Sequence, residues 1–92
     1  MKTAQQSYNL LLIDDSDIVS RRVASLISDY CEHCKIYFAK SSKEAYQNLN
    51  DRDFDFIIAD IQLEGKKRFD MIKFIKKLKK VPKLVVLTNQ VS

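Results

Sequence analysis

Short apolar runs recur along the chain, separated by longer segments of mixed polarity. The runs cover residues 9–13, 35–39, 54–59 and 83–87. Their length and their content of branched and aromatic residues predict β-strands. Because apolar residues fill successive positions rather than alternate ones, these strands are expected to be buried on both faces of a sheet.

The segments between the runs have apolar residues three or four positions apart, which predicts amphipathic helices at 16–30, 41–49 and 68–80. Ser16 can cap the first helix, and Ser41 with Glu44 forms the S-x-x-E pattern of a capping box before the second. The positions at helical spacing in the first and third helices are Ile18, Val19, Arg22, Val23, Leu26 and Ile27, and Phe69, Ile72, Ile75 and Leu78.

The alternation of strands and helices predicts an α/β fold, with a parallel sheet, right-handed crossovers and helices on both faces. Ligands of such sheets bind beyond the carboxyl ends of the strands. Asp14 and Asp15 follow the first apolar run, Asp60 follows the third, and Thr88 follows the fourth. We therefore expect these four residues to meet in a cleft at one edge of the sheet.

Composition places the chain among globular proteins. Of its 92 residues, 46% are hydrophobic and 30% are charged, with one Gly and one Pro. We expect a single domain without a flexible linker. No apolar run is long enough to span a membrane, and residues 1–9 lack the apolar stretch of a secretion signal, so we expect a cytoplasmic protein.

Carboxylates that gather at one edge repel one another, and a hard divalent cation relieves this repulsion. A cluster of Asp side chains without His or Cys favours Mg²⁺, or Mn²⁺ as an alternative, over zinc. An Asp beside such a cation can act as a nucleophile toward phosphorus and form an aspartyl-phosphate. A hydroxyl such as that of Thr88 can hydrogen-bond a phosphoryl oxygen.

The segments that carry these residues, LLIDDSD, FDFIIADIQL and KLVVLTN, resemble the sequence blocks of the response-regulator receiver domain of two-component signalling. The resemblance covers essentially the whole chain and implies a flavodoxin-like, doubly wound sheet of strand order 2-1-3-4. It implies a signalling module rather than an enzyme. Asp60 would accept a phosphoryl group from a histidine kinase or phosphotransfer protein, and Thr88 would sense it. The implied Mg²⁺ ligands are Asp14, Asp15, Asp60 and the backbone carbonyl of Gln62.

The resemblance has departures. Receiver domains have five β-α units, so residues 1–92 are expected to form one receiver-like domain that is incomplete at the C-terminus, without the family's fifth-strand lysine. Glu64 replaces the usual Pro, Lys67 and Arg68 replace Asp-Gly, and Asn89 replaces a small residue. These differences keep a second hypothesis open, a pseudo-receiver that binds partners without switching. A phosphatase with an aspartyl nucleophile ranks last, because Gln62 stands where its general acid is needed.

Three further features have alternative interpretations. The strand at 83–87 would be an apolar sheet edge, which favours a homodimer or a completing partner there. Cys31, His33 and Cys34 resemble half a zinc site or a redox pair, but two reduced cysteines are the simpler interpretation. Acidic residues outnumber basic ones over residues 1–65, whereas residues 66–92 are strongly basic. We interpret that basic surface as a solvated helix face, or a site for acidic proteins, rather than for nucleic acid.

Overall fold

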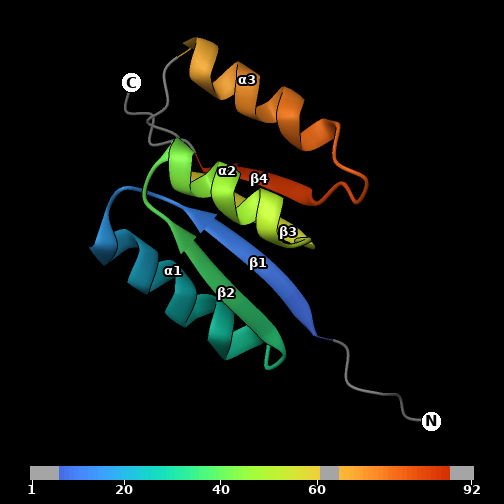
Figure 1. Ribbon diagram of the computed structural model, residues 1–92. Coiled ribbons are helices and arrows are strands. Elements are labelled where there is room, and N and C mark those ends of the chain that lie inside the picture. The colour runs from blue at the N-terminus through green and yellow to red at the C-terminus, as the bar shows by residue number, and fades with distance from the viewer. Residues whose placement is uncertain (1–6, 61–64, 88–92) are drawn as a thin grey trace, which may run out of the picture.

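The computed structural model describes residues 7–60 and 65–87, and the side chains of residues 7–59 and 69–86 (Figure 1). Seven elements alternate along these described residues, as the sequence predicts. They are β1 (Tyr8–Ile13), α1 (Asp17–Tyr30), β2 (Cys34–Ala39), α2 (Ser42–Asp51), β3 (Phe56–Asp60), α3 (Gly65–Lys76) and β4 (Lys83–Leu87).

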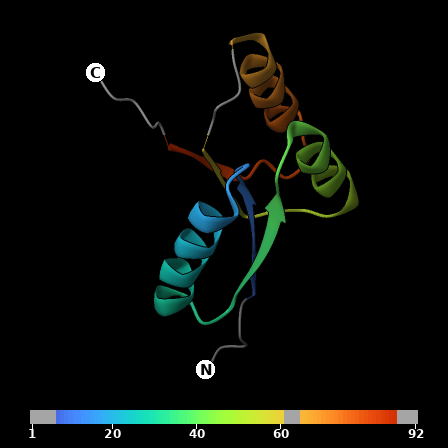
Figure 2. The same cartoon turned by 90° about the vertical axis from the view of Figure 1, so that its left-hand side faces the viewer.

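The four strands form one parallel sheet in the order β2-β1-β3-β4, which confirms the predicted topology. Helix α1 lies on one face of the sheet, and α2 and α3 lie side by side on the other (Figure 2). The register is continuous across the centre, because Ile13 pairs with Ala39 of β2 on one side and with Ala59 of β3 on the other. The carboxyl ends of β1, β2 and β3 therefore lie in one row.

The main hydrophobic core lies between the sheet and the pair α2 and α3. Phe54 is 1% exposed and its ring meets that of Tyr37 edge-on at 5.5 Å. Tyr46 of α2 and Phe74 of α3 make a similar edge contact at 5.0 Å, which joins the two helices. The buried residues of this core are Leu11, Ile13, Ala39, Ala45, Leu49, Phe54, Ile57, Ala59, Met71 and Ile75.

The opposite face of the sheet is covered less completely. The contacts of α1 are with β1 and β2, and Val85 of β4 is 48% exposed. The predicted apolar stripe of α1 is partly wrong, because Ile18 is 71% exposed and Leu26 60% exposed. The buried position of the helix is instead Ser20, which is 7% exposed. Ile18 and Leu26 lie away from the side of α1 that carries Ser20, so they face solvent.

Helix α3 and strand β3 differ from their predicted bounds. The helix, predicted at 68–80, ends at Lys76. Two short-range bonds, from Lys77 N to Phe74 O (3.1 Å) and from Leu78 N to Ile75 O (3.2 Å), tighten its end. The chain must then leave the helical conformation before Pro82. The strand, predicted at 54–59, covers Phe56–Asp60, and Phe54 is a core residue ahead of it.

The predicted capping box before α2 is present with a shift of one residue. Ser41 is the N-cap, and its hydroxyl accepts a hydrogen bond from Glu44 N at 3.2 Å. The Glu44 carboxylate accepts from the N–H of Lys40, at 3.0 Å, rather than from that of Ser41. The helix therefore begins where the sequence pattern indicates, and Lys40 is fixed at the end of β2.

Asp55 joins three strands at the amino edge of the sheet. Its carboxylate accepts from Asn9 N at 2.8 Å and from Lys80 Nζ at 2.7 Å. Its own N–H donates to Asn9 O, and its carbonyl accepts from Lys83 N. The hydrogen bond from Lys80, followed by that from Asn9, lowers the pKa of Asp55.

We expect Asp55→Ala to lower the free energy of unfolding by about 1–2 kcal/mol at neutral pH, because it leaves Asn9 N–H without its acceptor. A folded pKa below the unfolded value of about 3.9 means that this stabilisation is present above that value and disappears as the pH falls through the folded pKa. Urea unfolding followed by circular dichroism at neutral and acidic pH measures the difference. The exposed neighbour Asp53, replaced by Ala, should have less than half the effect. An equal loss in both variants, or a pH-independent one, contradicts this role of Asp55.

Candidate functional site

The candidate site lies at the carboxyl edge of the sheet, where the predicted acidic residues follow their strands. Asp60 is the last residue of β3 and pairs with Leu87, the last residue of β4. Because Ile13 pairs with Ala59, the next positions along these parallel strands, Asp14 and Asp60, are neighbours in the backbone. Gln62, Thr88 and the side chain of Asp60 lie outside the described residues, so their roles stay predictions.

Asp14 is the distinctive residue of this edge. Only 4% of its surface is exposed to solvent, which is unusual for an acidic residue. Its N–H donates to Ala39 O at 2.9 Å, and its Oδ1 accepts from Ser16 N at 2.8 Å, which fixes the carboxylate in the loop before α1. Its Oδ2 is buried and has no hydrogen-bond partner in the described part of the chain. Such an unpaired buried acceptor destabilises a fold unless another group binds it.

Asp15 and Asp17, which flank the N-cap residue Ser16, lie in environments that differ from that of Asp14. Asp15 is exposed, at the turn between β1 and α1. Ser16 caps α1 by accepting from Val19 N at 3.3 Å. Asp17 lies in the first turn of α1 and pairs with Lys40, the residue after β2, at 3.0 Å. The sequence did not indicate this ion pair, because its partners belong to separate segments.

A magnesium ion fits the donors that are described. The Oδ2 of Asp14, which has no partner among the described residues, and the neighbouring Asp15 would supply hard carboxylate oxygens, the type of ligand that Mg²⁺ prefers. No three His, Cys, Asp or Glu side chains gather into a metal cluster among the residues whose side chains are placed. The other predicted ligands, Gln62 and the Asp60 carboxylate, fall outside that set, so the complete ligand set stays a prediction.

The two cysteines lie at the opposite end of α1 from the acidic residues. Cys31 caps the C-terminus of α1, where its N–H donates a hydrogen bond to Ile27 O at 2.8 Å, and Cys34 begins β2. Both are free and half-buried, in agreement with the interpretation of two reduced thiols. Burial, and then a hydrogen bond with Cys31, raises the pKa of Cys34 to about 11, so its thiol stays protonated at neutral pH. A protonated thiol is a poor nucleophile and a poor metal ligand.

The basic segment 66–92 exposes its lysines to solvent where their side chains are described. Lys73, Lys76, Lys77 and Lys79 are all exposed, and Lys73 lies 5.0 Å from the ring of Phe69. The side chains of Lys66, Lys67 and Arg68 lie outside the described set. In the parts of the chain that are placed, no helix combines the length and apolar character needed to cross a bilayer.

Comparison with known sequences gives consistent matches. The family profile described as the response regulator receiver domain matches residues 10–92. The sensory transduction protein LytT of Bacillus subtilis is 28% identical over 79 residues, or 86% of this chain and 33% of that protein. LytT of Enterococcus faecalis is 29% identical over 80 residues, or 87% of this chain and 33% of that protein. The chain thus spans about a third of the length of these curated relatives.

Comparison with solved structures gives the same fold. The chemotaxis response regulator CheY4 of Vibrio cholerae superposes with a TM-score of 0.76 at 23% identity, over 95% of this chain and 72% of that one. A signal receiver domain of an HD domain-containing protein from Pseudomonas fluorescens Pf-5 gives a TM-score of 0.68 at 20% identity, over 95% of this chain and 68% of that one. At these identities the likeness shows the fold.

Proposed function

Because the chain belongs to the family of response regulator receiver domains, we propose that it acts as the phosphoacceptor of its response regulator, with Asp60 as the residue that carries the phosphoryl group. The observation that supports this most is the buried Asp14 carboxylate, whose Oδ2 has no partner among the described residues and which is next in the backbone register to Asp60. A stable fold retains such a group where a ligand binds it, and an aspartyl-phosphate site requires a cation there.

In this proposal the site residues have separate roles. Asp14 and Asp15, with Asp60 and the backbone carbonyl of Gln62, hold Mg²⁺, which neutralises the charge of the phosphoryl group during transfer. The Asp60 carboxylate attacks phosphorus, so that an O–P bond forms as the N–P bond of a phosphohistidine donor breaks. The hydroxyl of Thr88, directly after the partner of Asp60 in β4, donates a hydrogen bond to the phosphoryl group.

The partners follow from the same proposal. The phosphoryl donor is a histidine kinase or a phosphotransfer protein in the cytoplasm. Within the described sheet β4 pairs only with β3, and Val85 and Val86 are 48% and 36% exposed. That edge is where further chain, a partner or a second copy would complete the sheet. We propose no direct contact of this domain with nucleic acid.

A pseudo-receiver is the second candidate, favoured by Glu64, Lys67, Arg68 and Asn89 at positions where the family usually has other residues. In that case the fold binds a partner without chemistry on Asp60. Equal partner affinity of the wild type and Asp60→Ala, with and without phosphoryl donor, would support it. A phosphorylation-dependent affinity would support the phosphoacceptor.

Incubation with acetyl phosphate and Mg²⁺ tests the proposal without knowledge of the kinase. We expect the intact mass to rise by one phosphoryl group, and the product to be lost in acid and in base, as an acyl phosphate is. EDTA should prevent the reaction, because the charge of the donor is then not neutralised. The same amount of product with EDTA, or none under either condition, would contradict the proposed function.

A further inference from the structure

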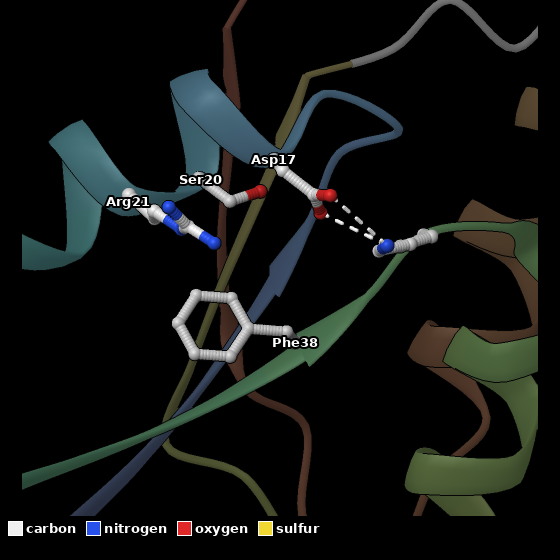
Figure 3. Close-up of a pocket in the computed structure, with 5 residues that line it drawn as sticks. Asp17, Ser20, Arg21 and Phe38 are labelled. Carbon is white, nitrogen blue, oxygen red and sulfur yellow. Dashed lines mark hydrogen bonds and ion pairs between the residues drawn. The ribbon is translucent and has the colours of Figure 1, made fainter.

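A cavity of about 250 Å³ lies between the first turns of α1 and the end of β2 (Figure 3). Asp17, Ser20 and Arg21 line it from the helix, and Phe38 and Lys40 from the strand. Figure 3 shows the guanidinium of Arg21 pointing toward the ring of Phe38, and the hydroxyl of Ser20 pointing toward Asp17. All five of these described lining residues belong to one β-α-β unit, β1-α1-β2.

The two sides of the pocket, Phe38 on β2 and Ser20 with Arg21 on α1, offer different chemistry. Phe38 is 48% exposed, so its ring presents an open apolar surface on an edge strand. Above it, the guanidinium of Arg21 makes no ion pair or hydrogen bond with another described residue, and the Ser20 hydroxyl is likewise without a described partner. A planar ring can pack on Phe38, and an anion can bind the guanidinium through two parallel hydrogen bonds.

The charge of the pocket favours an anion. Asp17 would repel one, but its carboxylate is paired with Lys40, at 3.0 Å. Among the described lining residues, Arg21 is therefore the charge without an opposite partner. Arginine is the side chain best matched to the planar geometry of a carboxylate.

We propose that this pocket binds a small planar aromatic carboxylate, with its ring on Phe38, its carboxylate on Arg21 and Ser20 available to a polar substituent. The volume supports a small molecule, since a cavity of about 150 Å³ holds one benzene and this one has room for a ring with its carboxyl group. None of the five described lining residues is a proposed phosphoacceptor or Mg²⁺ ligand, so we expect binding here not to require phosphorylation.

Titration of the ¹⁵N-labelled chain with benzoate tests this site, with amide shifts as the readout. We expect saturable shifts confined to the first turns of α1 and the end of β2, with an affinity in the millimolar range because the ligand has few atoms. Acetate, which lacks the ring, and benzamide, which lacks the charge, should each bind at least about ten-fold more weakly. The Asp60→Asn variant should bind benzoate as the wild type does, which separates this test from that of phosphorylation.

Arg21→Gln should weaken benzoate binding about ten-fold or more, whereas Arg22→Gln, one position along the same helix, should leave it unchanged. The spectra themselves show whether each variant is folded. Equal effects of the two substitutions, equal binding of acetate, or shifts spread over the lysines of α3 would overturn the proposal. Tighter binding of acetyl-Asp-Phe-amide than of benzoate by ten-fold would assign the pocket to a protein segment and overturn the small-molecule ligand.

Discussion

Replacing Asp60 by Asn should abolish phosphorylation by acetyl phosphate. An amide has no charged oxygen with which to attack phosphorus, so the reaction loses its nucleophile rather than part of its rate enhancement. We expect the rate of phosphoryl incorporation to fall by at least about a thousand-fold, the scale on which covalent catalysis depends on its nucleophile. Intact mass spectrometry of wild type and variant, with excess acetyl phosphate and Mg²⁺, measures this directly.

The matched control for this experiment is Asp53→Asn. Asp53 is an exposed acid next to the amino edge of the sheet, so the same chemical change there should leave the rate as in the wild type. Folding of both variants is checked by circular dichroism. Phosphorylation of Asp60→Asn at the wild-type rate would mean that another residue accepts the group, and a similar loss in Asp53→Asn would remove the specificity of the result.

Replacing Asp14 by Asn should weaken Mg²⁺ binding and stabilise the metal-free fold at once. The amide oxygen can still accept from Ser16 N–H, so the loop keeps the hydrogen bond that now measures 2.8 Å. What is lost is the charge and the acceptor at Oδ2, which is buried without a described partner. We expect Mg²⁺ affinity to fall at least about ten-fold and the free energy of unfolding in EDTA to rise by about 1–2 kcal/mol.

Urea unfolding in EDTA and in Mg²⁺ measures both effects of the Asp14 substitution, because a ligand of the native state raises its stability. Asp17→Asn is the matched control. It removes a carboxylate three residues away that is exposed and paired with Lys40, so the stability gained from Mg²⁺ should match that of the wild type. A metal-free Asp14→Asn variant that is less stable than the wild type, with its Mg²⁺ response intact, would show that Asp14 is a structural capping residue.

Much of the fold follows from local pattern. The apolar runs at 9–13, 35–39 and 83–87 lie within or coincide with strands β1, β2 and β4, because strands buried on both faces leave a continuous apolar signal. The parallel topology then determines which residues share an edge. That reasoning predicted Asp14 at the carboxyl edge, whereas its burial, and an Oδ2 without a partner among the described residues, are properties that only the structure shows.

Other features depend on contacts between distant segments and have no local signal. The periodicity of α1 includes Ile18 and Leu26, but only packing decides that Ser20 faces the sheet. Asp55 falls inside the run predicted as a strand at 54–59, and its role depends on Asn9 and Lys80, which are far along the chain. The pocket at Phe38 likewise needs the crossover that brings α1 over β2.

The central claim is that Asp60 carries the phosphoryl group, and the most direct measurement is the position of the modified residue. Borohydride reduces an acyl phosphate on an aspartate to homoserine, which marks the site permanently. After phosphorylation with acetyl phosphate and Mg²⁺, followed by reduction and peptide mass spectrometry, we predict homoserine at position 60 alone, and none when EDTA is present. Homoserine at another aspartate, or at none while the intact protein carries phosphate, would contradict the claim.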